Sequence, residues 1–122
     1  MGKSLRVVIA DDDADAVRTL EALLRDEGHT VLGVTGGKQA LKAIGEFGAD
    51  VVLLDIGMPD MNGYAVVEEL RRAYGGARPA LIAITGRADP ADKLVARMVG
   101  FDHYLSKPYD PGELLRLLGP YM

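Results

Sequence analysis

Short runs of apolar residues alternate with longer stretches in which apolar residues recur at helical spacing, and this alternation repeats five times along the chain. Short apolar runs rich in β-branched residues are typical of buried strands, whereas apolar residues three or four positions apart are typical of helices that pack on one side. We therefore expect five strands, at Leu5–Ala10, His29–Thr35, Val51–Asp55, Pro79–Thr85 and Phe101–Ser106.

A helix is expected after each strand. An Asp of the 11–15 cluster can cap the first helix, and Pro90 suits the first turn of the fourth. The apolar face of the fourth helix is formed by Leu94, Val95 and Met98. The expected helices run from the 11–15 cluster to Gly28, over Gly37–Phe47 and Tyr64–Tyr74, from Pro90 to Gly100, and over Pro111–Leu118.

Strands that alternate with helices predict crossover connections, and hence a parallel sheet with helices on both faces. The expected fold class is α/β, a doubly wound domain, and the length of 122 residues fits a single domain over residues 1–122. In such sheets ligands bind at the carboxyl ends of the strands. The residues that directly follow each strand are therefore the candidates for a functional site.

Composition narrows the class of protein. The net charge is −4, and Lys and Arg are scattered, so the sequence lacks the basic stripe of a nucleic-acid binder. No cysteine is present, which excludes disulfides and thiolate metal sites. No apolar run approaches the length of a membrane span, and the first residues do not resemble a signal peptide. We expect a cytoplasmic domain with neither a nucleic-acid nor a membrane partner.

Polar residues gather at the strand ends. Asp11 and Asp12 follow the first strand, Asp55 ends the third, Thr85 ends the fourth and Lys107 follows the fifth. Three carboxylates at one edge would repel each other unless a cation lies among them, and oxygen ligands without His or Cys favour Mg²⁺, or else Mn²⁺, over Zn²⁺. A Lys and a Thr beside a magnesium site suit phosphoryl chemistry, because they supply positive charge and a hydrogen-bond donor.

These residues carry a family resemblance. The motifs are Asp11-Asp12, the VVLLDIGMPDMNG segment around Asp55, Ile84-Thr85-Gly86 and Lys107-Pro108. Together they resemble the receiver domain of bacterial two-component response regulators over essentially the whole chain. The resemblance implies a flavodoxin-like sheet of order 2-1-3-4-5 with five helices. It also implies a signalling domain rather than an enzyme, one that catalyses only its own phosphorylation and dephosphorylation.

The resemblance also implies roles for single residues. Asp55 looks like the phosphoacceptor, which takes a phosphoryl group from a phosphohistidine of a sensor histidine kinase or histidine phosphotransfer domain. Asp12 looks like a direct Mg²⁺ ligand, Asp11 would act through a metal-bound water, and the Asp55 carboxylate and the backbone carbonyl of Gly57 would complete the set. Lys107 resembles the lysine that pairs with the phosphoryl group, and it precedes a proline where the family often has a cis peptide bond.

Switching would follow phosphorylation. Thr85 resembles the hydroxyl that moves toward the phosphoryl group, and Tyr104 resembles the aromatic residue that then swings inward. Two departures from the commonest pattern are Gly57, which places no side chain over the phosphoryl group, and Arg87, a long cation two residues after Thr85. We hypothesise that these two residues set the lifetime of the acyl phosphate.

Two other functions stay open. Residues 13–17 match the DxDxV pattern of haloacid-dehalogenase-like, Mg²⁺-dependent phosphatases, although that reading leaves Asp55 unexplained and the chain lacks room for a cap. An interaction module that is never phosphorylated is the other alternative. The downstream protein target is unknown, and the chain is either a single-domain regulator or a receiver from a longer protein; its GFDHYLSKPYDPGELL segment favours a hybrid histidine kinase.

Simpler interpretations apply to several polar residues. Asp13 and Asp15 are expected to cap the first helix or interact with its dipole. Asp60 and Asn62 are expected to be turn formers. The leucines of the last helix are expected to be mainly core, with part of that face free for a partner. His29 and His103 are both expected at the surface.

Overall fold

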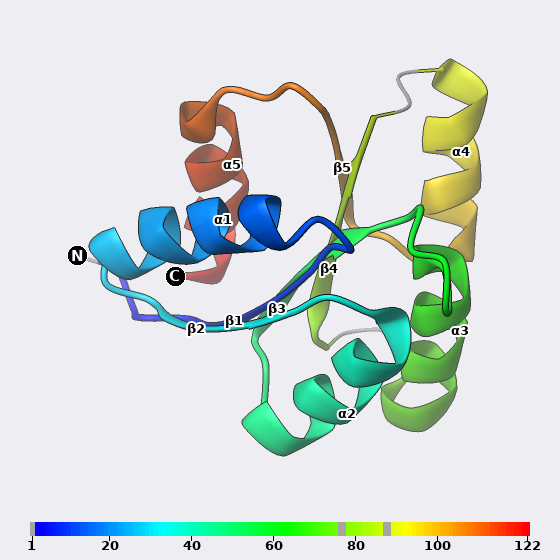
Figure 1. The fold of residues 1–122 in the computed structure, drawn as a ribbon, viewed down its shortest axis with the longest axis horizontal. Helices are drawn as coiled ribbons and strands as arrows, with labels where there is room; N and C mark the ends of the chain where they lie inside the picture. The colour runs from blue at the N-terminus through cyan, green and yellow to red at the C-terminus, as the bar shows by residue number, and fades with distance from the viewer. Residues whose placement is uncertain (1, 76–77, 87–88) are drawn as a thin grey trace.

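Five strands and five α-helices alternate along the chain (Figure 1). The computed structural model describes residues 2–75, 78–86 and 89–122. The elements are β1 (Arg6–Ala10), α1 (Ala14–Asp26), β2 (Thr30–Val34), α2 (Gly37–Phe47), β3 (Val51–Asp55), α3 (Gly63–Tyr74), β4 (Ala80–Thr85), α4 (Pro90–Val99), β5 (His103–Ser106), α5 (Pro111–Leu118) and the 3₁₀ turn η1 (Gly119–Tyr121).

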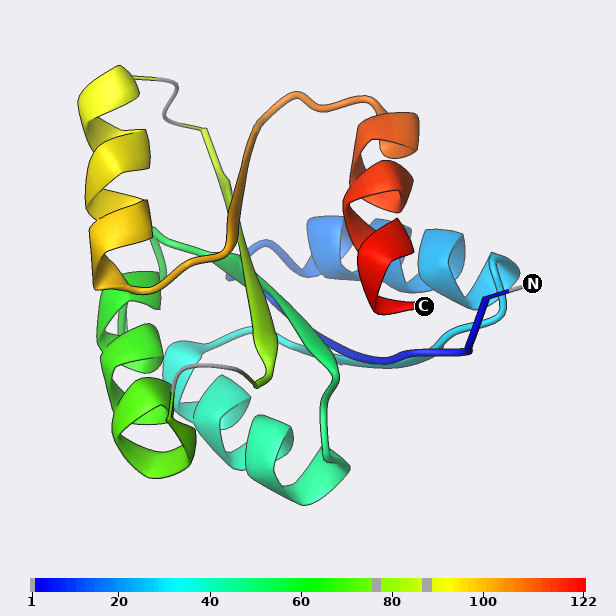
Figure 2. The ribbon, with the colours of Figure 1, turned by 180° about the vertical axis from the view of Figure 1, so that it is seen from behind.

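The five strands form one parallel sheet in the order β2-β1-β3-β4-β5. Helices α1 and α5 cover one face of the sheet, and α2, α3 and α4 cover the other (Figures 1 and 2). The predicted fold class, strand order and two-sided helix cover are therefore confirmed. The order of the strands turns between β1 and β3, so the carboxyl ends of these two neighbours lie at the switch point where ligands bind in doubly wound sheets.

The core has two layers because successive residues of a strand face opposite sides of the sheet. In β3, Val51 and Leu53 pack with α1 and α5, whereas Val52 and Leu54 pack with α2, α3 and α4. All four side chains are at most 1% exposed. The central strands therefore read as unbroken apolar runs, and their carboxyl ends are held rigidly by burial on both faces.

Several predicted strands begin one or two residues too early. The backbone amide of His29 bonds the carbonyl of Leu24, and that of Phe101 bonds the carbonyl of Ala96, so both residues close the preceding helix instead of starting a strand. Pro79 has no amide hydrogen to donate to the sheet. Leu5 lies just before β1, and α3 begins at Gly63, one residue earlier than expected.

The apolar face predicted for α4 is turned to solvent. Leu94, Val95 and Met98 are 60%, 44% and 76% exposed, and the residue of α4 that is fully buried is Ala96. The helix thus contacts the core through the small residue on its opposite side. Helical spacing predicted a stripe correctly, but not the direction in which the stripe points.

The prediction for His29 was wrong, because its side chain is only 6% exposed. Its Nδ1 atom accepts a hydrogen bond of 3.1 Å from the backbone amide of Leu5, the residue just before β1. His103 is half-buried, and its Nε2 atom lies 2.8 Å from the Tyr121 hydroxyl. Each histidine is therefore held by a residue far away in sequence.

The last helix, α5, is mainly core, as expected. Leu114 and Leu118 are fully buried, and Leu115 and Leu117 are half-buried at the edge of the same cluster. No helix among the described residues is long and apolar enough to cross a membrane.

Candidate functional site

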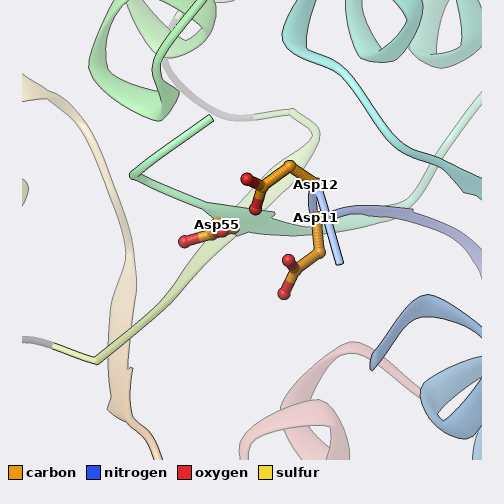
Figure 3. A group of neighbouring side chains, drawn as sticks. All are labelled: Asp11, Asp12 and Asp55. Carbon is orange, nitrogen blue, oxygen red and sulfur yellow. The ribbon is translucent and has the colours of Figure 1, made fainter. Parts of the chain in front are cut away.

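Three carboxylates meet where β1 and β3 end (Figure 3). Asp11 and Asp12 follow β1, and Asp55 is the last residue of β3. One oxygen from each side chain lies within 4.8 Å of the others. Asp11 is buried, Asp12 is exposed and Asp55 is intermediate, so the group opens to solvent on one side. Because the donors are all oxygens, this group fits a hard divalent cation such as Mg²⁺ or Mn²⁺ better than Zn²⁺.

The segment after β1 is shaped by its own aspartates. The Asp11 carboxylate accepts a hydrogen bond of 2.9 Å from the backbone amide of Asp13. The Asp13 side chain in turn accepts from the amides of Asp15 and Ala16, and so caps α1. The predicted capping role of Asp13 is thereby confirmed. Asp15 lies in the exposed first turn and pairs with Arg18, so neither residue belongs to the carboxylate group.

Lys107 closes the buried side of the group. Its Nζ atom lies 2.9 Å from Asp11 Oδ2, and the Asp11 side chain is only 4% exposed. Its backbone amide donates to the carbonyl of Thr85 at 2.7 Å, and its peptide bond to Pro108 is cis, as the resemblance implied. Burial alone would lower the pKa of Lys107, but the hydrogen bond and charge of Asp11 and the charge of Asp55 outweigh it and raise this pKa.

The charged form of the Asp55 carboxyl group is disfavoured by its surroundings. Burial of its carboxyl group raises its pKa from 3.8 to about 6, and the negative charge of Asp11 adds to this rise. The backbone amide of Gly57, at 3.2 Å from Asp55 Oδ1, and the charge of Lys107 act in the opposite direction. A carboxyl group whose charge is disfavoured in this way would gain from a bound cation.

Thr85 lies on β4, the strand next to β3, and Tyr104 lies on β5, the strand beyond it. Thr85 ends β4, is 5% exposed and pairs in register with Ser106 of β5. Tyr104 is half-buried in β5, packs against the core cluster beneath α2, α3 and α4, and has the Lys93 ammonium 5.9 Å from its ring centre. Arg87, the second residue of the lifetime hypothesis, lies outside the described residues.

The structure assigns further contacts to two residues that the sequence suggested only as turn formers. Asn62 caps α3 by accepting from the amide of Ala65 at 3.0 Å. Asp60 accepts from the amides of Gly37 and Lys38, at the start of α2. The sequence signal that could have indicated the Asp60 contact is the pair of adjacent glycines at the start of α2, because glycine permits a close approach of backbone.

Comparison with known proteins identifies close similarities. The family model described as "response regulator receiver domain" matches residues 7–118. An uncharacterised 14.6 kDa protein from the sodA1 3′ region of Leptolyngbya boryana is 34% identical over 115 residues, which cover 94% of this chain and 88% of that protein.

A longer relative and a solved structure are also similar to this chain. The DNA-binding response regulator MtrA of Mycobacterium tuberculosis is 36% identical over 110 residues, or 90% of this chain, and the chain spans about half of the length of MtrA, 47%. The structure of the chemotaxis response regulator CheY4 of Vibrio cholerae superposes with a TM-score of 0.89 at 26% identity, covering 98% of this chain and all (100%) of that one.

Proposed function

The chain belongs to the response regulator receiver domain family, and on that premise we propose that Asp55 accepts a phosphoryl group in a Mg²⁺-dependent reaction. The observation that carries the proposal is the meeting of three carboxylates with Lys107 at the ends of β1, β3 and β5. The proposal takes residues 1–122 as a single receiver domain that acts in the cytoplasm. Nothing among the comparisons or the described contacts favours the phosphatase alternative, since Asp13 and Asp15 lie outside this group.

In the proposed reaction, a carboxylate oxygen of Asp55 attacks the phosphorus of a phosphohistidine. The phosphorus–nitrogen bond breaks, the imidazole leaves with the electron pair and takes up a proton, and an acyl phosphate forms. Asp11, Asp12, Asp55 and the carbonyl of Gly57 would hold Mg²⁺, which would supply positive charge to the phosphoryl oxygens. The cation also favours the charged form of Asp55, which is the form that acts as nucleophile.

Lys107 and Thr85 would stabilise the product. The Lys107 ammonium is paired with Asp11 before phosphorylation, and it would turn toward the new phosphoryl oxygens when these add negative charge nearby. Thr85, at the end of the next strand, would donate its hydroxyl to the same group. Movement of Thr85 leaves space that Tyr104 fills, so a local change of charge alters the surface formed by β4 and β5.

The partners follow from this chemistry. The phosphoryl donor is a sensor histidine kinase or a histidine phosphotransfer domain. The partner that binds the phosphorylated form is a downstream protein. MtrA is a DNA-binding protein, but this chain spans only about half of its length. With a net charge of −4, the domain itself would contact no nucleic acid. It would catalyse only its own phosphorylation and dephosphorylation.

Gly57 offers room for control of the phosphoryl lifetime. The nearest heavy atom to a Cβ added at this position would be Asp55 Oδ1, at 3.9 Å. Water therefore has access that a larger side chain would restrict. We propose that Gly57, together with Arg87, sets the rate at which the acyl phosphate is hydrolysed.

Phosphorylation by a small donor tests the proposal. The purified protein is incubated with acetyl phosphate and Mg²⁺, and the incorporated phosphate is measured by intact mass. We expect at most one phosphoryl group per chain, none in Asp55→Asn, and full incorporation in the control Asp15→Asn, which alters an exposed aspartate outside the group. Undiminished labelling of Asp55→Asn would refute the assignment, and sustained turnover of a phosphomonoester would favour the phosphatase instead.

A further inference from the structure

The loop that joins β3 to α3, residues 56–62, is anchored to a helix that is distant in sequence. Its Asp60 carboxylate accepts hydrogen bonds from the backbone amides of Gly37, at 3.0 Å, and Lys38, at 3.2 Å. The first amides of a helix have no acceptor within the helix. The N-cap residue of α2 is Gly36, which has no side chain to serve them. Asp60 therefore caps α2 from another loop.

The two glycines at the start of α2, Gly36 and Gly37, allow this contact. A Cβ at Gly37 would lie 2.1 Å from the carbonyl oxygen of Met61, and one at Gly36 would lie 3.0 Å from the Asp60 carboxylate. Any side chain at Gly37 would thus force the loop away from the helix. The amide hydrogen bonds from Gly37 and Lys38 also lower the pKa of Asp60, so the contact is made to the charged carboxylate.

The same loop is fixed near its beginning. The Gly57 amide donates to Asp55, the Met58 side chain is buried in the core at 2% exposure, and the Gly63 amide bonds the carbonyl of Ile56 at 2.9 Å. Gly57 thus lies between a strand end that is held by the sheet and a carboxylate, Asp60, that is held by α2. Loss of the Asp60 contact would leave the residues after Gly57 held only by the Met58 side chain and the Gly63 amide.

We propose that Asp60 is a positioning residue of the cation site: by capping α2, it holds the backbone of Gly57 beside Asp55 so that the Gly57 carbonyl is ready to bind. The inference rests on the proposed function, because that function assigns the Gly57 carbonyl to the cation. When a residue that orients a metal ligand without touching the metal is replaced, the affinity of the site for the metal typically falls by about tenfold or more.

Direct cation binding tests the proposal without any phosphodonor. The affinity of the unphosphorylated protein for Mn²⁺ is measured by titration calorimetry for the parent, Asp60→Ala, Asp60→Asn and the control Asp89→Ala. Asp89 also caps a helix, since it accepts from the Ala91 amide at 2.9 Å, but that helix is α4. We expect Asp60→Ala to bind Mn²⁺ about tenfold more weakly. Asp60→Asn, which keeps an accepting oxygen, should lose less, and Asp89→Ala should bind like the parent.

A second variant and a kinetic measurement separate positioning from general loss of structure. Gly37→Ala changes the other side of the contact and should weaken Mn²⁺ binding in the same direction. In labelling with acetyl phosphate, the Mg²⁺ concentration for half-maximal rate should rise in Asp60→Ala, while the rate at saturating Mg²⁺ should match that of the parent. Circular dichroism verifies that each variant is folded.

The outcomes distinguish the two proposals. Parent-like Mn²⁺ affinity in Asp60→Ala, or an equal loss in Asp89→Ala, would overturn the positioning role and leave the assignment of Asp55 intact. Absence of Mn²⁺ binding to the parent would overturn both the cation site and the role of Asp60. A reduced rate at saturating Mg²⁺, with unchanged Mn²⁺ affinity, would also overturn the positioning role.

Discussion

Replacing Asp55 by Asn should stabilise the fold at neutral pH when divalent cations are absent. The charged Asp55 carboxylate is disfavoured first by its burial and then by the neighbouring charge of Asp11. Asparagine has the same shape and keeps an oxygen that can accept from the Gly57 amide, whose distance from Asp55 Oδ1 is 3.2 Å. The substitution therefore removes the unfavourable charge and leaves the favourable hydrogen bond.

The size of the effect follows from the pKa of Asp55. A rise from 3.8 to about 6 corresponds to at most about 3 kcal/mol, at about 1.4 kcal/mol per pH unit. Solvent reaches part of this carboxyl group and screens its interactions, so we expect about 1–2 kcal/mol.

The sign of the pH dependence is fixed by proton linkage. The folded protein binds the Asp55 proton more tightly than the unfolded chain does, so the parent loses stability as pH rises through the window from 3.8 to about 6. The advantage of Asp55→Asn should thus be fully present at about pH 7.5 and fall to about 0.5 kcal/mol at about pH 4.5.

Urea unfolding at these two pH values, in buffer with a chelator, measures the difference. Excess Mg²⁺ should then stabilise the parent by mass action and stabilise Asp55→Asn less, because the variant lacks one of the three carboxylates. Equal free energies of unfolding for the parent and the variant at about pH 7.5 would refute this reasoning. So would a difference that is the same at both pH values, because the charge of Asp55 would then not be its cause.

Three other substitutions test separate features. Gly33→Ala in β2 should destabilise the fold by about 1–3 kcal/mol in urea unfolding, because its Cβ would lie 2.4 Å from Val17 Cγ1. Lys107→Met should lower the free energy of unfolding at neutral pH by about 1–2 kcal/mol, since it leaves the buried Asp11 carboxylate without its ammonium partner. Gly57→Asn should change the half-life of the acyl phosphate, measured by loss of intact mass after removal of the donor, because its side chain would stand beside Asp55.

For each of these three predictions, one result would contradict the reasoning. Gly119→Ala is the control for the first, since a Cβ there would meet nothing within 4 Å, and equal stability of the two glycine variants would contradict the packing argument. An unchanged free energy in the lysine variant would contradict the role of its ion pair. Half-lives that match the parent in both Gly57→Asn and Arg87→Ala would sink the lifetime hypothesis.

Much of the site could be predicted from the local pattern of apolar and polar residues in the sequence. The buried strand Val51–Asp55 was correct at both ends, because a strand covered on both faces is an unbroken apolar run with sharp limits. Once five such runs alternate with helices, the carboxyl ends of parallel strands must share one edge. The meeting of Asp11, Asp12 and Asp55 was therefore predictable without any knowledge of their distances.

The failures concern contacts between residues that are distant in sequence. The side chain of His29 is buried because its acceptor nitrogen serves the amide of Leu5, and Asp60 accepts hydrogen bonds from amides of α2. No local period records such partners. The exposed stripe of α4 illustrates the same limit, since helical spacing defines a face but tertiary packing through Ala96 decides where that face points.

The most direct test of the account is to locate the phosphoryl group itself. The protein is phosphorylated with acetyl phosphate in Mg²⁺ and reduced with borohydride, which converts an aspartyl phosphate to homoserine, and its peptides are mapped by mass spectrometry. The account predicts homoserine at position 55 alone. Homoserine at Asp11 or Asp12, or phosphate that is retained on a hydroxyl group, would contradict it.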